Sequence, residues 1–134
     1  MTELLNVTNL TKSFGEVTAV NDLSFSMTEG EILGMMGPNG AGKTSVFNLL
    51  SGVFLPDKGK VEFRGQDITR FSASKRCKYG IGRTYQIPQP FNKLTVYENL
   101  LVSAVHGGRI SESRARDRIK EILAMVGLFE QRNQ

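Results

Sequence analysis

Apolar and polar side chains alternate in several short stretches near the start of the chain. The alternation runs from Leu4 to Phe14, recurs in residues 18–20 and 23–27, and returns in residues 60–63. A period of two predicts β-strands that bury one face and expose the other. Asn21-Asp22 is a pair typical of turns and separates two of the stretches. We therefore expect short strands here, with residues 60–63 at an exposed edge.

The segment from Glu31 to Met36 has a different pattern, because nearly all of its side chains are apolar or small. A short continuous apolar run is typical of a strand in a parallel sheet that is covered on both faces. Residues 81–85 predict a further strand. Thr44–Leu50 predicts a helix, and Gly52 is a suitable C-cap because glycine readily adopts the left-handed conformation.

Helical spacing dominates the second half of the chain. Residues 72–79 predict a short helix that carries part of a basic cluster. Thr95 precedes a second helical pattern that extends to Ala104, and Glu98 three residues later completes a capping box. Ser111 is expected to begin a third helix that ends at Gly127. Its predicted apolar face consists of Ile119, Ile122, Leu123 and Val126.

The composition is ordinary for a globular protein: 134 residues, 40% hydrophobic and 22% charged, with a net charge of +4. No apolar run could span a bilayer, no signal-peptide pattern precedes the first strand, and Cys77 is the single cysteine. We therefore expect one cytoplasmic domain without disulfides. Basic residues cluster in segments 75–83 and 109–120, but the second cluster alternates with acids and no platform of several aromatic residues is interleaved with either. Nucleic acid is therefore not an expected partner.

Residues 37–44, Gly-Pro-Asn-Gly-Ala-Gly-Lys-Thr, match the phosphate-loop pattern G-x-x-x-x-G-K-[ST]. Glycines allow successive N–H groups to turn toward a polyphosphate, and the start of the following helix adds partial positive charge. Lys43 is expected to reach the β- and γ-phosphates, Thr44 to bind Mg²⁺ and Ser45 to contact the α-phosphate. The other predicted nucleotide contacts in the loop are Asn39, Gly40, Ala41 and Gly42. A glycine-rich turn with a surface lysine is the alternative, but it does not explain the strand and helix patterns on either side.

Many protein classes share this loop, so the flanking segments must distinguish between them. The chain resembles the nucleotide-binding domain of ABC ATPases along its whole length. The matching segments are residues 10–15, 19–25, 29–34, 37–44, 56–61, 65–69, 80–86 and 94–100. The resemblance implies an α/β P-loop NTPase core with an N-terminal antiparallel β-subdomain and the start of a helical subdomain, divided as residues 1–94 and 95–134. It also implies ATP and Mg²⁺ as cofactors.

The resemblance assigns roles to three residues outside the phosphate loop. Phe14 occupies the aromatic position that stacks on adenine in this family, and Val20 is expected near the same base. Stacking on an aromatic ring reads little of a base's identity. Gln86 matches the glutamine that joins the Mg²⁺ shell or the attacking water, so Gln86 and Lys43 are the expected catalytic residues. Phe14 as a core residue and Gln86 as a solvated loop residue are the alternatives.

Within the ABC family, residues 80–91 and 94–99 resemble the LivG-type ATP-binding subunits of branched-chain amino acid importers and their urea or amide importer relatives. This implies a subunit on the inner face of the membrane that contacts transmembrane permease subunits. It also implies a dimer with a second, identical or different, ATP-binding subunit. Residues 87–92 are expected at the permease surface, since exposed Pro88, Pro90 and Phe91 suit a contact better than a plain turn.

Three of the family's later motifs do not occur in the printed sequence: a signature similar to L-S-G-G-Q, a strand that ends in Asp-Glu, and the switch histidine. We therefore expect a truncated, N-terminal part of the domain that binds Mg-ATP weakly and hydrolyses it poorly. His106 is expected to be a loop residue without a catalytic role. Two other interpretations stay open, namely a soluble ABC ATPase that works without a transporter and a non-catalytic ATP-binding module.

Overall fold

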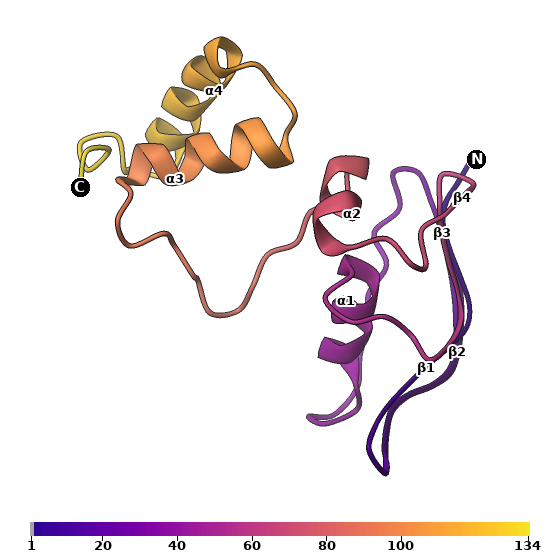
Figure 1. Cartoon of the computed structure of the whole chain (residues 1–134). Helices are drawn as coiled ribbons and strands as arrows, with labels where there is room; N and C mark the ends of the chain where they lie inside the picture. The colour runs from indigo at the N-terminus through magenta and orange to yellow at the C-terminus, as the bar shows by residue number, and fades with distance from the viewer. Residues whose placement is uncertain (1) are drawn as a thin grey trace. The chain divides into compact units, whose positions relative to one another are not determined.

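The computed structural model describes residues 2–134, which form two compact units that meet in the chain at Arg76 and Cys77. The first unit contains the β-strands and the first helix, and the second unit is helical (Figure 1). The boundary falls inside helix α2 (Ala73–Tyr79). The division into subdomains at residues 94 and 95 remains a prediction.

The first unit is built on a four-stranded antiparallel sheet. Its strands are β1 (Glu3–Phe14), β2 (Val17–Thr28), β3 (Lys58–Phe63) and β4 (Gln66–Asp67), in the spatial order β2-β1-β3-β4. The strands predicted from the alternating stretches are confirmed in β1, β2 and β3, whereas β4 occupies residues for which the sequence predicts no strand. Contrary to prediction, β3 is not at an edge. It lies between β1 and β4, and its alternating residues Val61 and Phe63 are buried.

The turn predicted at Asn21-Asp22 is wrong, because β2 runs through it as one strand. Asp22 adopts a positive φ of 51° and the β1–β2 register shifts nearby. Side chains of β1 support this irregular backbone: Thr11 Oγ1 accepts a hydrogen bond from Asp22 N–H at 3.1 Å, and Asn9 donates to Asp22 Oδ1 at 2.7 Å. Hydrogen bonds across the hairpin therefore let a turn-prone pair remain within a strand.

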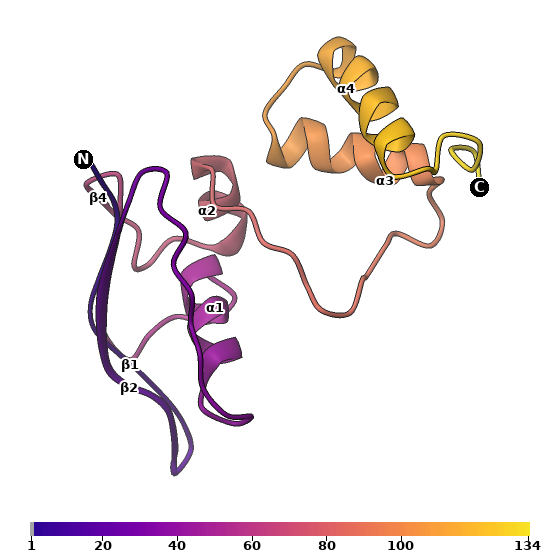
Figure 2. The same cartoon turned by 180° about the vertical axis from the view of Figure 1, so that it is seen from behind.

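Helix α1 (Lys43–Ser51) lies on one face of the sheet in both views (Figures 1 and 2). Gly52 caps its C-terminus with φ 79°, as predicted. Val46 and Leu49 are buried on the helix, and the sheet supplies most of the remaining core. The buried apolar residues of this unit are Val7, Leu10, Val20, Val46, Leu49, Val61, Phe63 and Ile68.

Two predicted strands do not form, at residues 31–36 and 81–85. Ile32 and Met36 are 97% and 96% exposed instead of buried. A strand is held by hydrogen bonds to its neighbours, and within residues 2–134 no strand pairs with either segment. An apolar run shows that a segment can be buried in a sheet, but it does not supply the neighbouring strands.

The second unit packs two helices together. Helix α3 (Val96–Val102) begins with the predicted capping box and continues into a π-helical segment, Ser103–Gly107, before helix α4 (Glu112–Met125). Ala115, Ile119 and Leu123 form the core of this unit. Val126 is exposed, contrary to prediction, because α4 ends at Met125 and Val126 has left helical geometry. None of the described helices is both long and apolar enough to cross a membrane.

Candidate nucleotide site

The predicted phosphate loop lies at the start of α1 and against strand β2. Gly40 and Gly42 both have φ 85°, in the left-handed region. Gly42 is the N-cap of α1, and a Cβ atom there would lie 2.1 Å from the carbonyl oxygen of Ala19. Glycine is therefore required at position 42, both for its backbone conformation and for close packing of the loop on β2. The sequence pattern does not reveal the contribution of Ala19, because only its main chain takes part.

Lys43, the first residue of α1, folds its side chain back over the loop. Its Nζ donates to the carbonyl oxygen of Gly37 and, at 2.7 Å, to that of Pro38. A Cβ atom at position 37 would lie 3.3 Å from the Cβ of Ala41 and 4.0 Å from this Nζ. Glycine thus keeps open the space beside the ammonium group, where phosphate oxygens could replace the carbonyl oxygens as its partners.

The first turn of α1 has the chemistry that an anion requires. The N–H groups of Lys43, Thr44 and Ser45 have no intrahelical acceptor, because the first helical hydrogen bond runs from Val46 N–H to Gly42 O. No acidic residue lies in this turn. The helix dipole adds partial positive charge at the same place. These residues therefore fit a polyphosphate group.

A magnesium ion also fits this arrangement. Thr44 is exposed in the first turn of α1, where its hydroxyl is accessible. Among residues 2–134 there is no cluster of three His, Cys, Asp or Glu side chains that could hold a metal. Mg²⁺ at a nucleotide commonly takes one or two protein oxygens together with phosphate oxygens and water, so a preformed cage is not needed.

The two residues expected beside the base both lie in the first unit. Val20 is buried, and its Cγ2 is 3.9 Å from where a Cβ of Gly42 would lie, so it supports the phosphate loop directly. Phe14 ends β1 and is 43% exposed, which leaves part of its ring accessible. The β1–β2 turn and the loop before α1 lie at the same end of the unit (Figures 1 and 2).

Phe14 is held by neighbours that the sequence motifs did not indicate. Its ring makes an edge contact with Phe54, with centroids 5.1 Å apart, and Lys12 Nζ lies 5.5 Å from its centroid. Lys12 also pairs with Asp57 at 2.8 Å, and Asp57 accepts a hydrogen bond from Ser13 N–H at 2.7 Å. The hydrogen bonds from Lys12 and Ser13 lower the pKa of Asp57 below its ordinary value.

Gln86 is the one predicted site residue in the second unit. It is exposed in the segment between α2 and α3, as are Ile87 and Phe91. The side-chain amide of Asn99 on α3 holds the end of this segment, since it accepts from Phe91 N–H at 2.8 Å and donates to Leu94 O at 3.1 Å. The segment therefore has a fixed end and presents apolar side chains to solvent.

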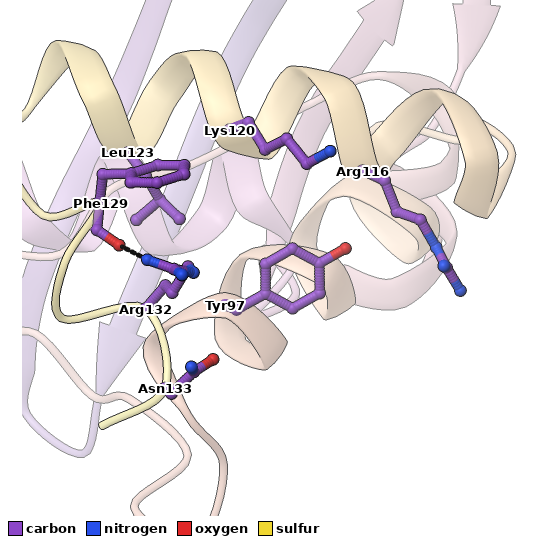
Figure 3. A pocket seen from close by; sticks show the side chains of 7 residues that line it. All are labelled: Tyr97, Arg116, Lys120, Leu123, Phe129, Arg132 and Asn133. Carbon is purple, nitrogen blue, oxygen red and sulfur yellow. Dashed lines mark hydrogen bonds between the residues drawn. The ribbon is translucent and has the colours of Figure 1, made fainter.

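The second unit also contains a cavity of about 320 Å³ (Figure 3). It is lined by Tyr97, Arg116, Lys120, Leu123, Phe129, Arg132 and Asn133. Two of its cations already have partners, because Arg116 pairs with Glu112 at 2.6 Å and Arg132 donates to Phe129 O at 2.8 Å. No residue predicted to bind nucleotide lines this cavity.

The chain is similar to ATP-binding proteins of ABC transporters in sequence and in structure. A family model described as ABC transporter matches residues 20–134. A probable branched-chain amino acid transport ATP-binding protein LivG from Archaeoglobus fulgidus is 42% identical over 120 residues, which are 89% of this chain and 47% of that protein. The LivG protein of Methanocaldococcus jannaschii, also named as probable, is 40% identical over 79% of this chain and 41% of its own length.

A solved structure of a nucleotide-free ATP-binding cassette from an ABC transporter superposes with a TM-score of 0.77 at 32% identity. The match covers 98% of this chain and 57% of that one. The chain thus spans about half the length of the proteins that it matches, and its fold is the N-terminal portion of an ABC ATPase domain. Because the family match covers most of the chain and includes the whole phosphate loop, the chain belongs to the ATP-binding proteins of the ABC transporter family.

Proposed function

We propose that this chain binds Mg-ATP through residues 37–45, as the nucleotide-binding part of an ABC importer subunit. The observation that supports this best is the arrangement at α1, where Lys43 Nζ is held by the carbonyl oxygens of Gly37 and Pro38 above a helix N-terminus. Those two neutral acceptors are weaker partners for an ammonium group than phosphate oxygens are. A bound nucleotide would therefore take their place on Lys43.

Each end of the nucleotide has a proposed partner. The exposed face of Phe14 would stack on the adenine, and the main-chain N–H groups of residues 39–45 would bind the phosphates. Thr44 would contribute its hydroxyl to Mg²⁺. Gln86 would join the metal shell or orient the attacking water.

The proposed partners follow from the relatives and from one exposed segment. Proteins named for branched-chain amino acid transport are similar to this chain over most of its length, which supports that cargo class for the complete transporter. Residues 87–92 expose Ile87 and Phe91, and we place the contact with transmembrane permease subunits there. The subunit would dimerise with a second ATP-binding subunit at the inner face of the membrane.

We further propose that the 134-residue chain hydrolyses ATP slowly, if at all. Phosphoryl transfer depends on positioning and on stabilising charge from several directions. In the first unit the phosphate loop supplies such groups from one side, through Lys43 and the first turn of α1. Steady turnover that is abolished by Lys43→Ala would contradict this proposal.

The first test is a calorimetric titration of Mg-ATP into the unaltered chain and into Lys43→Ala. Removing the ammonium group should weaken binding at least about tenfold, because a charge-assisted hydrogen bond contributes about 1.5–3 kcal/mol. Lys93→Ala, at an exposed loop position, is the matched control and should bind like the unaltered chain. Equal affinity in all three proteins would refute a phosphate site at residues 37–45.

A further inference from the structure

Arg76 is the largest fully buried side chain of the described residues, with 0% exposure. Its guanidinium donates four hydrogen bonds, all to main-chain carbonyl oxygens. Nη1 donates to Leu49 O at 2.6 Å and to Leu50 O at 2.9 Å, Nη2 donates to Thr69 O at 2.9 Å, and Nε donates to Phe71 O at 3.1 Å. Among residues 2–134 no carboxylate forms an ion pair with it.

Two of the four acceptors are carbonyl oxygens in the last turn of α1, those of Leu49 and Leu50. The final carbonyls of a helix have no intrahelical donor, and a cation is favourable beside them because of the helix dipole. No basic residue lies in the last turn of α1 itself. Arg76, on α2, supplies a donor and a positive charge to this turn, and its partner Leu50 is 26 residues earlier in the chain.

The packing around Arg76 leaves little freedom at this end of α1. A Cβ atom on the C-cap residue Gly52 would lie 3.0 Å from both Cδ and Nε of Arg76. Burial lowers the pKa of Arg76, while the negative charge of Asp67 opposes this change. Burial of an arginine is costly unless its donors are satisfied, and four of the five N–H groups of Arg76 donate hydrogen bonds here. The guanidinium is thus committed to its carbonyl partners.

Helix α1 is short, with nine residues and a length of about 13 Å. Isolated helices of this length are marginal in water and depend on tertiary contacts. At the C-terminal end of α1 this contact is Arg76, and at the N-terminal end it is the close packing of Gly42 on Ala19. Loss of order at one end of so short a cooperative element should therefore be felt at the other.

We propose that Arg76 is a positioning residue for the phosphate loop: by holding the C-terminal carbonyls of α1, it keeps the first turn of the helix ordered. This inference rests on the proposed function in so far as the loop binds nucleotide. Its structural part, the coupling between the two ends of α1, does not depend on any ligand.

The test is residue-resolved amide hydrogen exchange on the full chain without nucleotide, in the unaltered protein and in Arg76→Lys. Lysine keeps the charge but cannot make the forked contact with Leu49 and Leu50. The amide of Val46, which donates to Gly42 O at 3.0 Å, should exchange about tenfold faster in Arg76→Lys. The exchange rates of the β1 amides should be the same in both proteins. Arg70→Lys, at an exposed position of the preceding loop, is the control and should change neither the exchange rate of Val46 nor the rates of the β1 amides.

A purely structural role would raise exchange in β1 and α1 alike, and this result would overturn the inference. If Arg76→Lys does not fold, native-state hydrogen exchange of the unaltered chain in low denaturant tests whether the two ends of α1 open together. The amides of Val46 and Arg76 should then open with the same free energy. Independent opening of α1's first turn would overturn the inference.

A parallel Mg-ATP titration separates this inference from the proposed function. Folded Arg76→Lys should bind about tenfold more weakly than the unaltered chain. Unchanged affinity together with unchanged Val46 exchange would overturn the positioning role while leaving the nucleotide site intact. Absence of binding by the unaltered chain would overturn the proposed function, and the exchange experiment would still decide whether Arg76 orders the loop.

Discussion

Gly40 and Gly42 have the same backbone conformation but different surroundings. Both have φ 85°, a conformation that costs a residue with a Cβ atom about 1–2 kcal/mol. Nothing lies within 4 Å of a Cβ placed on Gly40, whereas a Cβ on Gly42 would meet Ala19 O at 2.1 Å. The pair therefore separates backbone strain from steric overlap inside one loop.

We expect Gly42→Ala to lower the free energy of unfolding more than Gly40→Ala does. Gly40→Ala should lose about 1–2 kcal/mol from strain alone, and Gly42→Ala should lose about 1–3 kcal/mol more from overlap with a main-chain oxygen that cannot easily move. Urea denaturation of the two variants measures the difference. Equal losses would mean that the loop does not pack on Ala19 as described.

The burial of Arg76 could not be predicted from its identity as a basic residue. In the sequence Arg76 is one of several basic residues in segment 75–83, and arginine side chains are mostly exposed in folded proteins. The structure buries it completely, while Lys75 and Lys78 on the same helix remain exposed. The acceptors that permit this are main-chain carbonyls, which exist at every position and leave no mark in the sequence.

At the scale of secondary-structure elements, the α3 capping box is a feature that the sequence predicted in full. Thr95 Oγ1 accepts from Glu98 N–H at 3.2 Å, and Glu98 Oε2 accepts from Thr95 N–H at 2.7 Å. The hydrogen bonds from the main chain and then the side chain of Thr95 lower the pKa of Glu98 below its ordinary value of 4.5. The box could be read from the sequence because both partners lie within four residues of each other.

The lowered pKa of Glu98 makes this part of the stability depend on pH. A carboxyl group whose pKa is depressed by folding stabilises the fold above its unfolded pKa, and this stabilisation disappears as pH falls through the folded pKa. We expect Glu98→Gln, which keeps an acceptor, to lose less stability than the unaltered chain as pH falls below about 5. Thermal unfolding followed by circular dichroism across this range measures the effect. Exposed Glu130→Gln should retain the pH dependence of the unaltered chain.

The segment 31–36 illustrates the opposite outcome at this scale. Its composition predicts a buried strand, and the helix and loop that follow it are found where expected. The strand itself needs neighbours on both sides, which lie far away in sequence. Sheet pairing is a non-local property, and so an apolar run can be recognised without its partner being known.

At the scale of the whole molecule, the consequence is an apolar surface in the first unit. Ile32, Leu33 and Met36 are exposed within five consecutive residues, 32–36, and within residues 2–134 no strand pairs with their backbone. Unpaired backbone beside apolar side chains is a template for association with another chain. We therefore expect the isolated chain to self-associate as its concentration rises.

A double variant, Ile32→Thr with Met36→Thr, should reduce this self-association without lowering stability, since both side chains are almost fully exposed. Sedimentation velocity over a range of protein concentrations measures the extent of self-association. Met125→Thr removes an exposed apolar side chain from α4 and serves as the control, which should associate like the unaltered chain. If the double variant associates to the same extent, the segment is not the contact surface.

The sequence by itself determined the features that depend on neighbours a few residues apart. These are the alternating strands and the helix patterns, the phosphate-loop motif on α1, and the caps at Gly52 and Thr95. They were predictable because each depends on local backbone preference or on hydrogen bonds within one turn of chain. The family resemblance likewise rests on short motifs in the order in which they occur.

Only the tertiary structure decided which groups meet across long stretches of chain. Gly42 packs on Ala19, Phe14 contacts Phe54, and Arg76 binds the end of α1. The segment 31–36 is exposed for the same reason, since burial requires a partner and not merely an apolar sequence. Such contacts depend on the path of the folded backbone, and main-chain atoms, which are identical at nearly every position, provide many of them.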